Sequence, residues 1–361
     1  MKKILYLVAH RPDRSPGQRF RFEQYLDYLA ANGFEYEISY LLNEQDDRDF
    51  YSPGKYFRKF LILLKSVRKR FGDINKAKQA DIVFIYREAV MFGSTYFERR
   101  LNKNGAKIIL DYDDAIWLMD VSEGNKNLKW LKRPSKTGDI CGYSRLVITG
   151  NNYLADYARQ FAKQVAVIPT TLVTDIFKRI DTPKIGDAVC IGWTGSSTTL
   201  KHLESALPFL KELKSRFRDK ISFRVIADKP FLPDDPDFEF CKWSKETEVA
   251  DLCAIDIGIM PLPDDEWARG KCGFKGLQYM ALGIPAVMSP VGVNTEIISD
   301  GVNGFLASSV DEWVEKLSQL IESPGLRLQF GTQGRKTIEE RYSFNSQKAT
   351  YLELFRDVAA G

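Results

Sequence analysis

The sequence predicts an α/β protein with two parallel sheets, on the strength of three observations. Short apolar segments alternate with amphipathic helical segments along most of the 361 residues. Strands that alternate with helices favour βαβ units with right-handed crossovers onto a parallel sheet. The alternation breaks once, between about residues 169 and 186, and then resumes. At a prior of about 150 residues per domain, the length also fits two domains.

The first alternation fills the N-terminal half. Its predicted strands are continuous apolar runs, which are typical of parallel strands covered on both faces. They lie at 3–9, 36–42, 81–86, 106–110, 145–150 and 166–168. The predicted helices lie at 19–32, 55–71, 92–103 and 152–163.

The second alternation has predicted strands at 188–193, 223–227, 256–262 and 285–290. We therefore expect two Rossmann-like domains, 1–172 and 173–341, that face each other across a cleft. Ligands of such sheets bind beyond the carboxyl ends of the strands, so the residues that follow each strand are the first candidates for a site.

Composition excludes several function classes. The 52 Lys and Arg exceed the 48 Asp and Glu by only 4, which does not indicate nucleic-acid binding. The two histidines, His10 and His202, lie far apart in the sequence, which disfavours His-ligated metals and Ser-His-Asp chemistry. Five scattered cysteines form no C-x-x-C pair and are typical of reduced thiols in a cytoplasmic protein. No segment resembles a signal peptide or a membrane span.

The strongest candidate for an anion site lies within the second alternation, between the predicted strands 256–262 and 285–290. Lys271 and Lys275 are one helical turn apart, and Gln278 lies one turn further along the same expected face. Lysines beside the free amides of a helix N-terminus suit phosphate, and the Gln278 amide suits a ribose or base edge. The alternative is an amphipathic helix with solvated lysines.

A glycine turn after the strand at 188–193 offers a second anion site. The amides near Gly195, Ser196 and Ser197 would bind a phosphate, and Lys201 on the next helix would add charge. The alternative is a simple turn capped by a serine. Neither G-x-G-x-x-G after the first strand nor a P-loop motif occurs, which disfavours dehydrogenases and P-loop enzymes.

These segments resemble the donor-binding domain of family 4 glycosyltransferases, over about 120 residues. The residues that match in order and spacing are Gly195, Lys201, Met280-Ala281-Leu282-Gly283-Ile284-Pro285, Glu296-Ile297 and Asp300-Gly301-Val302-Asn303-Gly304. The sequence departs from the family pattern at three positions. Ser196 stands in place of an Arg, and Gly270 and Gln278 stand in place of the two Glu residues of the motif. The resemblance implies the GT-B fold, with residues 342–361 as a helix that crosses back to the first domain.

In the first half, Asp111-Tyr112-Asp113-Asp114 ends an apolar strand. Carboxylates at this position are costly unless they serve a ligand or a cation, so we expect a catalytic role for Asp113 or Asp114. Helix capping by Asp114 is the alternative. Asp111-x-Asp113 is also a formal D-x-D metal motif, which we take as coincidental. The resemblance further implies that the turn at Gly17 contacts donor and acceptor.

The resemblance implies a retaining glycosyltransferase (EC 2.4 class) that moves a sugar from a nucleoside diphosphate sugar to a glycan or lipid-linked hydroxyl acceptor, in bacterial cell-surface polysaccharide or glycoconjugate synthesis. Donor binding is expected from Gly17, Gly195, Ser196, Lys201, Lys271, Lys275, Gln278 and Glu296. Catalysis is expected from Asp113, Asp114, Lys201 and Lys271. We expect no metal or cofactor. The alternatives are a sugar-nucleotide epimerase of GT-B fold and a non-catalytic sugar-nucleotide-binding subunit.

The segment 55–71 combines apolar and basic residues and contains no acidic residue. Such a helix suits an anionic membrane interface, and we expect peripheral binding at the inner face of the cell membrane. The basic residues expected on its exposed flank are Arg58, Lys59, Lys65, Arg68, Lys69 and Arg70. The alternative is an ordinary sheet-packing helix with a solvated basic rim.

Overall fold

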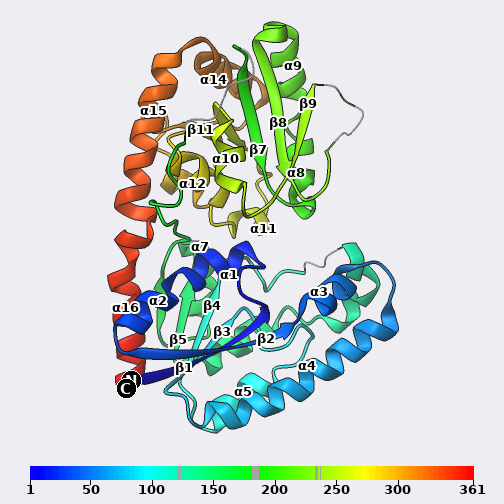
Figure 1. Cartoon of the computed structure of the whole chain (residues 1–361), viewed down its shortest axis with the longest axis vertical. Helices are drawn as coiled ribbons and strands as arrows, with labels where there is room; N and C mark the ends of the chain where they lie inside the picture. The colour runs from blue at the N-terminus through cyan, green and yellow to red at the C-terminus, as the bar shows by residue number, and fades with distance from the viewer. Residues whose placement is uncertain (120–122, 181–186, 232–234, 236) are drawn as a thin grey trace. The chain divides into compact units, whose positions relative to one another are not determined.

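The computed structural model describes residues 1–119, 123–180, 187–231, 235 and 237–361. They form two compact units, Met1–Thr170 with Gln347–Gly361, and Thr171–Ser346. Each unit is built on a six-stranded parallel sheet (Figure 1). The prediction of two parallel α/β sheets is thereby confirmed. Of the predicted connection at 169–186, residues 181–186 lie outside the described residues.

The N-terminal sheet has the strand order β2-β1-β3-β4-β5-β6, and every neighbouring pair is parallel. The strands are β1 (Lys2–His10), β2 (Phe34–Leu42), β3 (Ile82–Tyr86), β4 (Ile108–Tyr112), β5 (Leu146–Thr149) and β6 (Val165–Val167). Every residue of β3, β4 and β5 is buried. Burial on both faces explains why these strands are continuous apolar runs in the sequence.

The helices of this unit are α1 (Pro16–Arg21), α2 (Leu26–Ala31), α3 (Glu44–Tyr51), α4 (Tyr56–Ala77), α5 (Tyr96–Lys103), α6 (Lys136–Tyr143) and α7 (Asn152–Arg159), with the 3-10 segments η1 (Glu23–Tyr25) and η2 (Glu123–Leu131). The helix predicted at 19–32 is interrupted at Phe22, whose φ of −134° is not helical. Helix α3 was not predicted from its mostly polar residues; Asn43 caps it by accepting from the amide of Asp46.

Two residues expected on the exposed basic flank of α4 are buried instead, so that prediction is wrong for them. Lys59 and Arg70 are each only 1% exposed. The Lys59 ammonium donates to the backbone oxygen of Gly124 at 2.6 Å, and Arg70 pairs with Asp73 at 2.8 Å. Buried charges persist only when paired and hydrogen-bonded, and these partners satisfy that condition.

The C-terminal sheet has the order β12-β11-β10-β7-β8-β9. Its strands are β7 (Val189–Thr194), β8 (Ile221–Ala227), β9 (Phe238–Lys242), β10 (Ile257–Met260), β11 (Ala286–Met288) and β12 (Phe305–Leu306). Edge strand β9 has only partly buried or exposed residues and so lacks the apolar run that predicts a strand. Strand β12 has two residues, which is too short for a sequence pattern.

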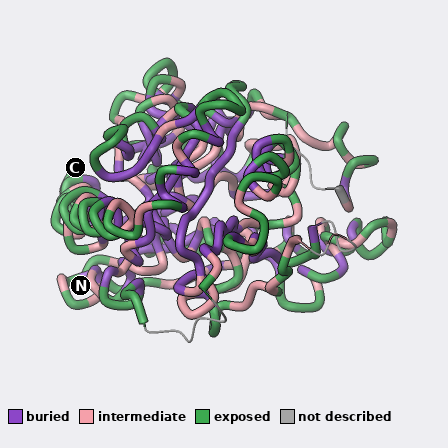
Figure 2. The backbone as a smooth tube through the Cα atoms, turned by 90° about the horizontal axis from the view of Figure 1, so that it is seen from above, coloured by how far each residue is buried: buried purple, intermediate pink, exposed green. Residues whose placement is uncertain are grey.

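The helices of the C-terminal unit are α8 (Leu200–Glu204), α9 (Leu207–Phe217), α10 (Glu248–Cys253), α11 (Glu266–Arg269), α12 (Phe274–Ala281), α13 (Asn294–Ile297), α14 (Val310–Glu322) and α15 (Pro324–Thr337), with the 3-10 segments η3 (Ser197–Thr199) and η4 (Arg218–Lys220) and the π-helical segment η5 (Ile338–Tyr342). Figure 2 shows buried strands surrounded by helices with exposed outer faces. Phe209 of α9 stacks on Trp313 of α14, with ring centroids 4.6 Å apart. A buried aromatic of this kind contributes about 3–5 kcal/mol relative to alanine.

The last helix, α16 (Phe344–Ala360), packs with the N-terminal unit from Gln347 onward. Tyr351 stacks on Tyr25 at 4.1 Å between centroids, and Phe355 stacks on Phe84 at 6.0 Å. The side chains of Tyr351 and Phe355 on α16 are fully buried. The return of the C-terminal helix to the first unit agrees with the fold that the resemblance implied.

Candidate active site

The donor-binding residues predicted in the second half follow three adjacent strands. Gly195 follows β7, Lys271 lies in the segment after β10, and Glu296 lies on α13 after β11. Strands β11, β10 and β7 are neighbours in the sheet, so these residues gather at one edge, at the carboxyl ends of the strands. We call this region the donor edge.

Three lysines converge at the donor edge around one buried histidine. Burial lowers the pKa of His202 on α8, and the charges of Lys275, Lys201 and Lys271 lower it further, to about 4. The three ammonium groups therefore lie near enough to His202 to oppose its protonation, and the Asp265 carboxylate acts on it in the opposite direction. The predicted lysines are thus brought together, in a field that suits a diphosphate.

Aromatic rings hold two of these lysines. The Lys275 ammonium lies 5.3 Å from the centre of the Trp193 ring, and the Lys271 ammonium lies 5.0 Å from that of Trp267. Cation–π contacts of this kind orient an ammonium group. Lys275 lies in the first turn of α12, whereas Lys271 precedes it, because Gly273 with a φ of +68° ends the preceding segment. The expectation that one helix carries both lysines is therefore wrong.

Gln278 does not present its amide to a ligand, contrary to the prediction. Its side chain is buried and its Nε2 donates to Oε1 of Glu248 at 3.1 Å. The same carboxylate oxygen accepts from the indole of Trp243 at 3.2 Å. Gln278 faces inward because it lies on the buried side of α12, where it links that helix to α10.

The glycine turn after β7 is closed by internal hydrogen bonds. The amide of Ser196 donates to the Thr199 hydroxyl at 3.1 Å, and that of Ser197 donates to Asp228. The amide of Gly195 donates to the backbone oxygen of Ile226 at 3.0 Å. The three amides predicted to bind phosphate are therefore engaged within the chain, and that prediction is wrong for this structure. At Ser197 the Asp228 carboxylate occupies the place expected for an anion.

Gly195 is nevertheless required where it stands. A Cβ at this position would lie 2.3 Å from the Trp193 ring. Because real Cβ atoms do not approach so closely, only glycine lets the turn pack on this tryptophan. Lys201, one turn further, is exposed at the start of α8.

In the N-terminal unit, a second cluster forms where β3 and β4 end. Arg87 follows β3 and donates to Oδ1 of Asp113 at 2.7 Å and to the carboxylate of Asp114. The Tyr86 hydroxyl also donates to Oδ1 of Asp113, at 2.7 Å. Burial would raise the pKa of Asp113, but the guanidinium of Arg87 and the other donors lower it on balance. Asp113 is thus ionised, and the Asp114 carboxylate accepts from Arg87 rather than capping a helix.

Backbone strain and a close approach hold this cluster. Arg87 has a φ of +64°, a left-handed conformation that costs a non-glycine residue about 1 kcal/mol or more and concentrates at functional sites. Gly17, on α1, lies against the same groups, since a Cβ there would be 2.1 Å from the Tyr86 hydroxyl and 3.2 Å from Oδ2 of Asp113. The structure therefore brings predicted residues Gly17, Asp113 and Asp114 together.

A hollow of about 290 Å³ adjoins this cluster. Its lining includes the polar residues His10, Tyr86, Arg87, Glu88 and Lys132 and the apolar residues Phe50, Leu63, Met91, Phe92, Leu128 and Leu131. Burial would raise the pKa of Glu88, but Lys136 and Lys132, at 2.7 and 3.2 Å, lower it overall. We call this hollow the N-terminal pocket.

Part of the sequence and the whole fold are similar to those of known proteins. Residues 188–323 match the family model described as "Glycosyl transferases group 1". A solved sucrose-phosphate synthase from Thermosynechococcus elongatus superposes with a TM-score of 0.70 at 13% identity, over 100% of both chains. HepE from Anabaena, solved with UDP and glucose, superposes with a TM-score of 0.70 at 11% identity, over 99% of this chain and 100% of HepE. The chain has the GT-B fold.

A further solved structure is similar to the chain. The glycosyltransferase from Rickettsia africae gives a TM-score of 0.69 at 15% identity, over 99% of this chain and 98% of that one. No curated protein sequence matches the chain. The group 1 glycosyltransferase domain and these neighbours are consistent with a transferase. The matched segment of the GT-B chain contains the donor edge from Gly195 to Glu296.

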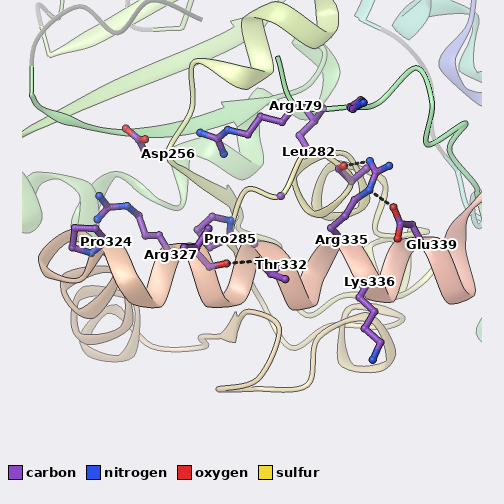
Figure 3. Close-up of a pocket in the computed structure, with 15 residues that line it drawn as sticks. Arg179, Asp256, Leu282, Pro285, Pro324, Arg327, Thr332, Arg335, Lys336 and Glu339 are labelled. Carbon is purple, nitrogen blue, oxygen red and sulfur yellow. Dashed lines mark hydrogen bonds and ion pairs between the residues drawn. The ribbon is translucent and has the colours of Figure 1, made fainter. Parts of the chain in front are cut away.

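The C-terminal unit also contains a larger hollow, of about 770 Å³, away from the donor edge (Figure 3). It lies between α15 and the turn that precedes β11, at the amino ends of β10 and β11. Arg335 on its wall donates to the backbone oxygen of Thr174 at 3.0 Å and pairs with Glu339 at 2.6 Å. Ligands of GT-B sheets bind at the opposite ends of the strands, so we assign this hollow no part in donor binding.

Sequence reasoning missed His202 and Tyr86. Only the neighbouring Lys201 marked His202. The segment Tyr86-Arg87-Glu88 stood out at the end of a strand, with Arg87 as a partner for the acidic cluster, but nothing in it gave Tyr86 a role. Among the described residues, no group of three or more His, Cys, Asp or Glu side chains is placed to hold a metal ion. Within the same residues, no helix is long and apolar enough to cross a membrane.

Proposed function

We propose that this protein is a retaining glycosyltransferase of family 4 that transfers a sugar from a nucleoside diphosphate sugar to a hydroxyl of a glycan or lipid-linked acceptor. The proposal rests above all on the convergence of Lys201, Lys271 and Lys275 at the donor edge of a group 1 glycosyltransferase domain. Its neighbour HepE was solved with UDP and with UDP-glucose, which supports a nucleotide-sugar donor here.

The lysines would act on the leaving group. As the glycosidic bond to the donor breaks, negative charge grows on the departing diphosphate. Preorganised ammonium groups stabilise such charge in the transition state more than in the ground state. Lys201 and Lys271 are the residues we assign to this role, and Lys275 and Glu296 would help to hold the donor.

In the N-terminal unit, Asp113 and Asp114 with Arg87 would orient the reacting sugar or the acceptor hydroxyl. The departing phosphate can take the acceptor proton on the face it leaves, so transfer with retention needs no histidine base. We further propose that no metal takes part. Oδ1 of Asp113 accepts from both Arg87 and Tyr86, and a carboxylate paired with a guanidinium in this way is a poorer ligand for a cation.

The acceptor would bind in the N-terminal pocket. A lining of both polar and apolar side chains suits a molecule that carries hydroxyls and an apolar body, such as a lipid-linked sugar. On this basis we propose a place in bacterial cell-surface polysaccharide or glycoconjugate synthesis.

The test is incubation with a panel of nucleotide sugars, with and without acceptor extracts, while nucleoside diphosphate release is measured. Release that requires acceptor supports transfer. Conversion of the donor sugar without acceptor would identify an epimerase, and binding without turnover would identify a non-catalytic subunit. Analysis of the anomeric configuration of the product then decides between retention and inversion.

A further inference from the structure

The larger hollow of the C-terminal unit has the volume of a small-molecule site, about 770 Å³, and takes no part in the proposed transfer. It lies at the amino ends of β10 and β11, and we call it the amino-end hollow. Positive charge prevails among the side chains that line it. The basic members are Lys178, Arg179, Arg327, Arg335 and Lys336, and the acidic members are Asp256 and Glu339.

Two of the basic residues are engaged along α15. Arg335 pairs with Glu339 at 2.6 Å and donates to the backbone oxygen of Thr174 at 3.0 Å. The Lys336 ammonium lies 3.9 Å from the carboxylate of Glu340. Figure 3 shows the Lys336 side chain pointing to the far side of α15. We therefore assign these two residues to the helix and its contacts.

The other three basic residues keep hydrogen-bond donors for a ligand. Within the part of the chain that the structure describes, the exposed side chains of Lys178 and Arg179 form no hydrogen bond or ion pair. Arg327 is half-buried, and its NH1 donates to the backbone oxygens of Leu320 and Ile321 at 2.6 and 3.0 Å, which fixes the guanidinium in the wall. Figure 3 shows Arg179 and Arg327 extending toward the same end of the hollow, the first from the connecting segment and the second from α15. Planar guanidinium groups match the oxygens of a phosphate.

The Asp256 carboxylate opposes an anion only in part. It is buried, and its Oδ2 accepts from the Cys190 amide at 2.9 Å, which ties it to β7. One negative charge thus stands against the three positive charges of Lys178, Arg179 and Arg327. The balance of charge in the hollow favours an anion.

Apolar side chains of the lining suit the organic part of a ligand. Leu282 and Pro285, from the turn before β11, and Leu328 of α15 belong to this lining. Leu328 is 74% exposed, so a ligand would remove apolar surface from water. The two walls are held at a fixed spacing, since a Cβ at Gly331 of α15 would lie 2.1 Å from the backbone oxygen of Gly283 in the turn.

We infer that the amino-end hollow binds a small organic phosphate, with its phosphate on Lys178, Arg179 and Arg327 and its organic part against Leu328 and Pro285. Phosphate fits better than carboxylate, because it carries up to twice the negative charge and presents three oxygens to the converging donors. The inference does not depend on the proposed function. In the part of the chain that the structure describes, the lining of this hollow includes no residue of the donor edge.

Fluorine NMR with para-fluorophenyl phosphate as the probe tests the site. The measurements use the full-length chain with Lys201→Ala/Lys271→Ala, so that the donor edge lacks two of its cations. We expect saturable broadening of the probe signal at millimolar concentration, and none for para-fluorophenol.

Two cation pairs are then compared in that chain. Lys178→Ala/Arg179→Ala removes exposed side chains, so the fold is kept, and the Kd should rise roughly tenfold or more with the loss of two charge-assisted contacts. The matched control Lys211→Ala/Lys220→Ala removes two exposed lysines of the same unit, outside the hollow, and should leave the Kd unchanged.

A further variant adds a negative charge and keeps every cation of the hollow. Thr332 lines the hollow from an exposed position on α15, and its hydroxyl donates to the backbone oxygen of Leu328 at 2.8 Å. Thr332→Glu should raise the Kd roughly fivefold or more by repulsion of the phosphate, whereas the neutral Thr332→Gln should change it by less than about twofold. Inorganic phosphate should displace the probe roughly fivefold less well than phenyl phosphate, because it has no apolar part.

Four outcomes would overturn the inference. The first is binding that requires intact Lys201 and Lys271, which would place the probe at the donor edge. The second is a Kd that Lys178→Ala/Arg179→Ala and Thr332→Glu leave unchanged. The third is an equal effect of the control pair Lys211→Ala/Lys220→Ala, which would indicate non-specific attraction to the surface. The fourth is equal displacement by inorganic phosphate and phenyl phosphate, which would exclude recognition of the organic part.

Discussion

The Arg21 guanidinium donates two hydrogen bonds to the Asp111 carboxylate, from Nε to Oδ1 at 3.0 Å and from NH2 to Oδ2 at 2.8 Å. The two side chains are 1% and 0% exposed, and they join α1 to β4. Both carboxylate oxygens of Asp111 are therefore engaged beneath the cluster of Asp113. The first residue of the formal D-x-D motif supports the fold and does not face a ligand.

Removal of one partner of this pair should destabilise the protein strongly. Asp111→Ala leaves the Arg21 charge buried without a counter-ion, which costs about 3–5 kcal/mol. Urea unfolding followed by circular dichroism measures the loss. The control Asp139→Ala breaks an exposed pair with Arg133 and should cost less than about 1 kcal/mol. Equal losses in the two variants would contradict the structural role of Asp111.

Metal chelation should leave the enzyme active. With Asp111 bound to Arg21 and Asp113 to Arg87, neither carboxylate is placed to hold Mn²⁺ or Mg²⁺. We expect sugar transfer to proceed unchanged in EDTA. Loss of activity in EDTA that Mn²⁺ alone restores would establish a metal-dependent reaction and overturn this proposal.

Substitution of the converging lysines should weaken donor use. Lys201→Ala and Lys271→Ala each remove a charge-assisted contact to phosphate that contributes about 1.5–3 kcal/mol, so kcat/KM should fall roughly tenfold to a hundredfold. Lys211→Ala, on the exposed side of α9, is the matched control. Full activity in both donor-edge variants would remove the assignment of the donor edge.

His202 should report donor binding by its titration. A nucleoside diphosphate bound among the lysines adds negative charge, so the pKa of His202 should rise from about 4. Because the chain has only two histidines, their NMR signals separate readily, and His10 serves as the internal reference. A change in the pKa of both histidines, or of neither, on addition of UDP would contradict the assignment of the donor edge.

The same histidine makes stability depend on pH. Its pKa in the folded protein lies below the ordinary value of 6.5, so between pH 6.5 and 4 the unfolded chain binds a proton that the folded chain does not. Stability from this source is complete above pH 6.5 and is lost as pH falls toward 4, by about 1–3 kcal/mol. His202→Gln should lose less stability than wild type over this range in urea unfolding. Identical pH profiles would refute the depressed pKa.

Neutralisation of the N-terminal carboxylates should slow turnover. Asp113→Asn weakens the hold on Arg87, whose left-handed backbone depends on that pairing, and Asp114→Asn removes its second acceptor. We expect kcat to fall at least tenfold, while nucleotide affinity at the donor edge stays unchanged. Reduced nucleotide affinity with normal kcat would place these residues in donor binding instead.

The sequence predicted the sheets well because buried parallel strands are continuous apolar runs, as in β3 and β4. The gathering of Lys201 and Lys271 was also predictable, since carboxyl ends of neighbouring parallel strands meet at one edge. Failures came from contacts between distant residues. The buried Gln278 amide donates to Glu248, which lies 30 positions away in the sequence. The buried Lys59 ammonium donates to Asn125, which lies 66 positions away. The apolar and basic residues of α4 were evident from the sequence. Which face of the helix turns inward depends on its contacts with residues such as Ser39, and no local sequence pattern reveals these contacts.

Helix α16 has a consequence for how the chain is made. Tyr351 and Phe355 fill the core of the N-terminal unit against Tyr25 and Phe84, yet they are synthesised after the entire C-terminal unit. A ribosome adds about 5–20 residues per second, so the first sheet waits roughly ten seconds or longer for its last core residues. During that interval the apolar surface meant for α16 is uncovered. The unit that begins first therefore completes its core last, and a chain shortened by the final 15 residues would remain open to chaperones and proteases.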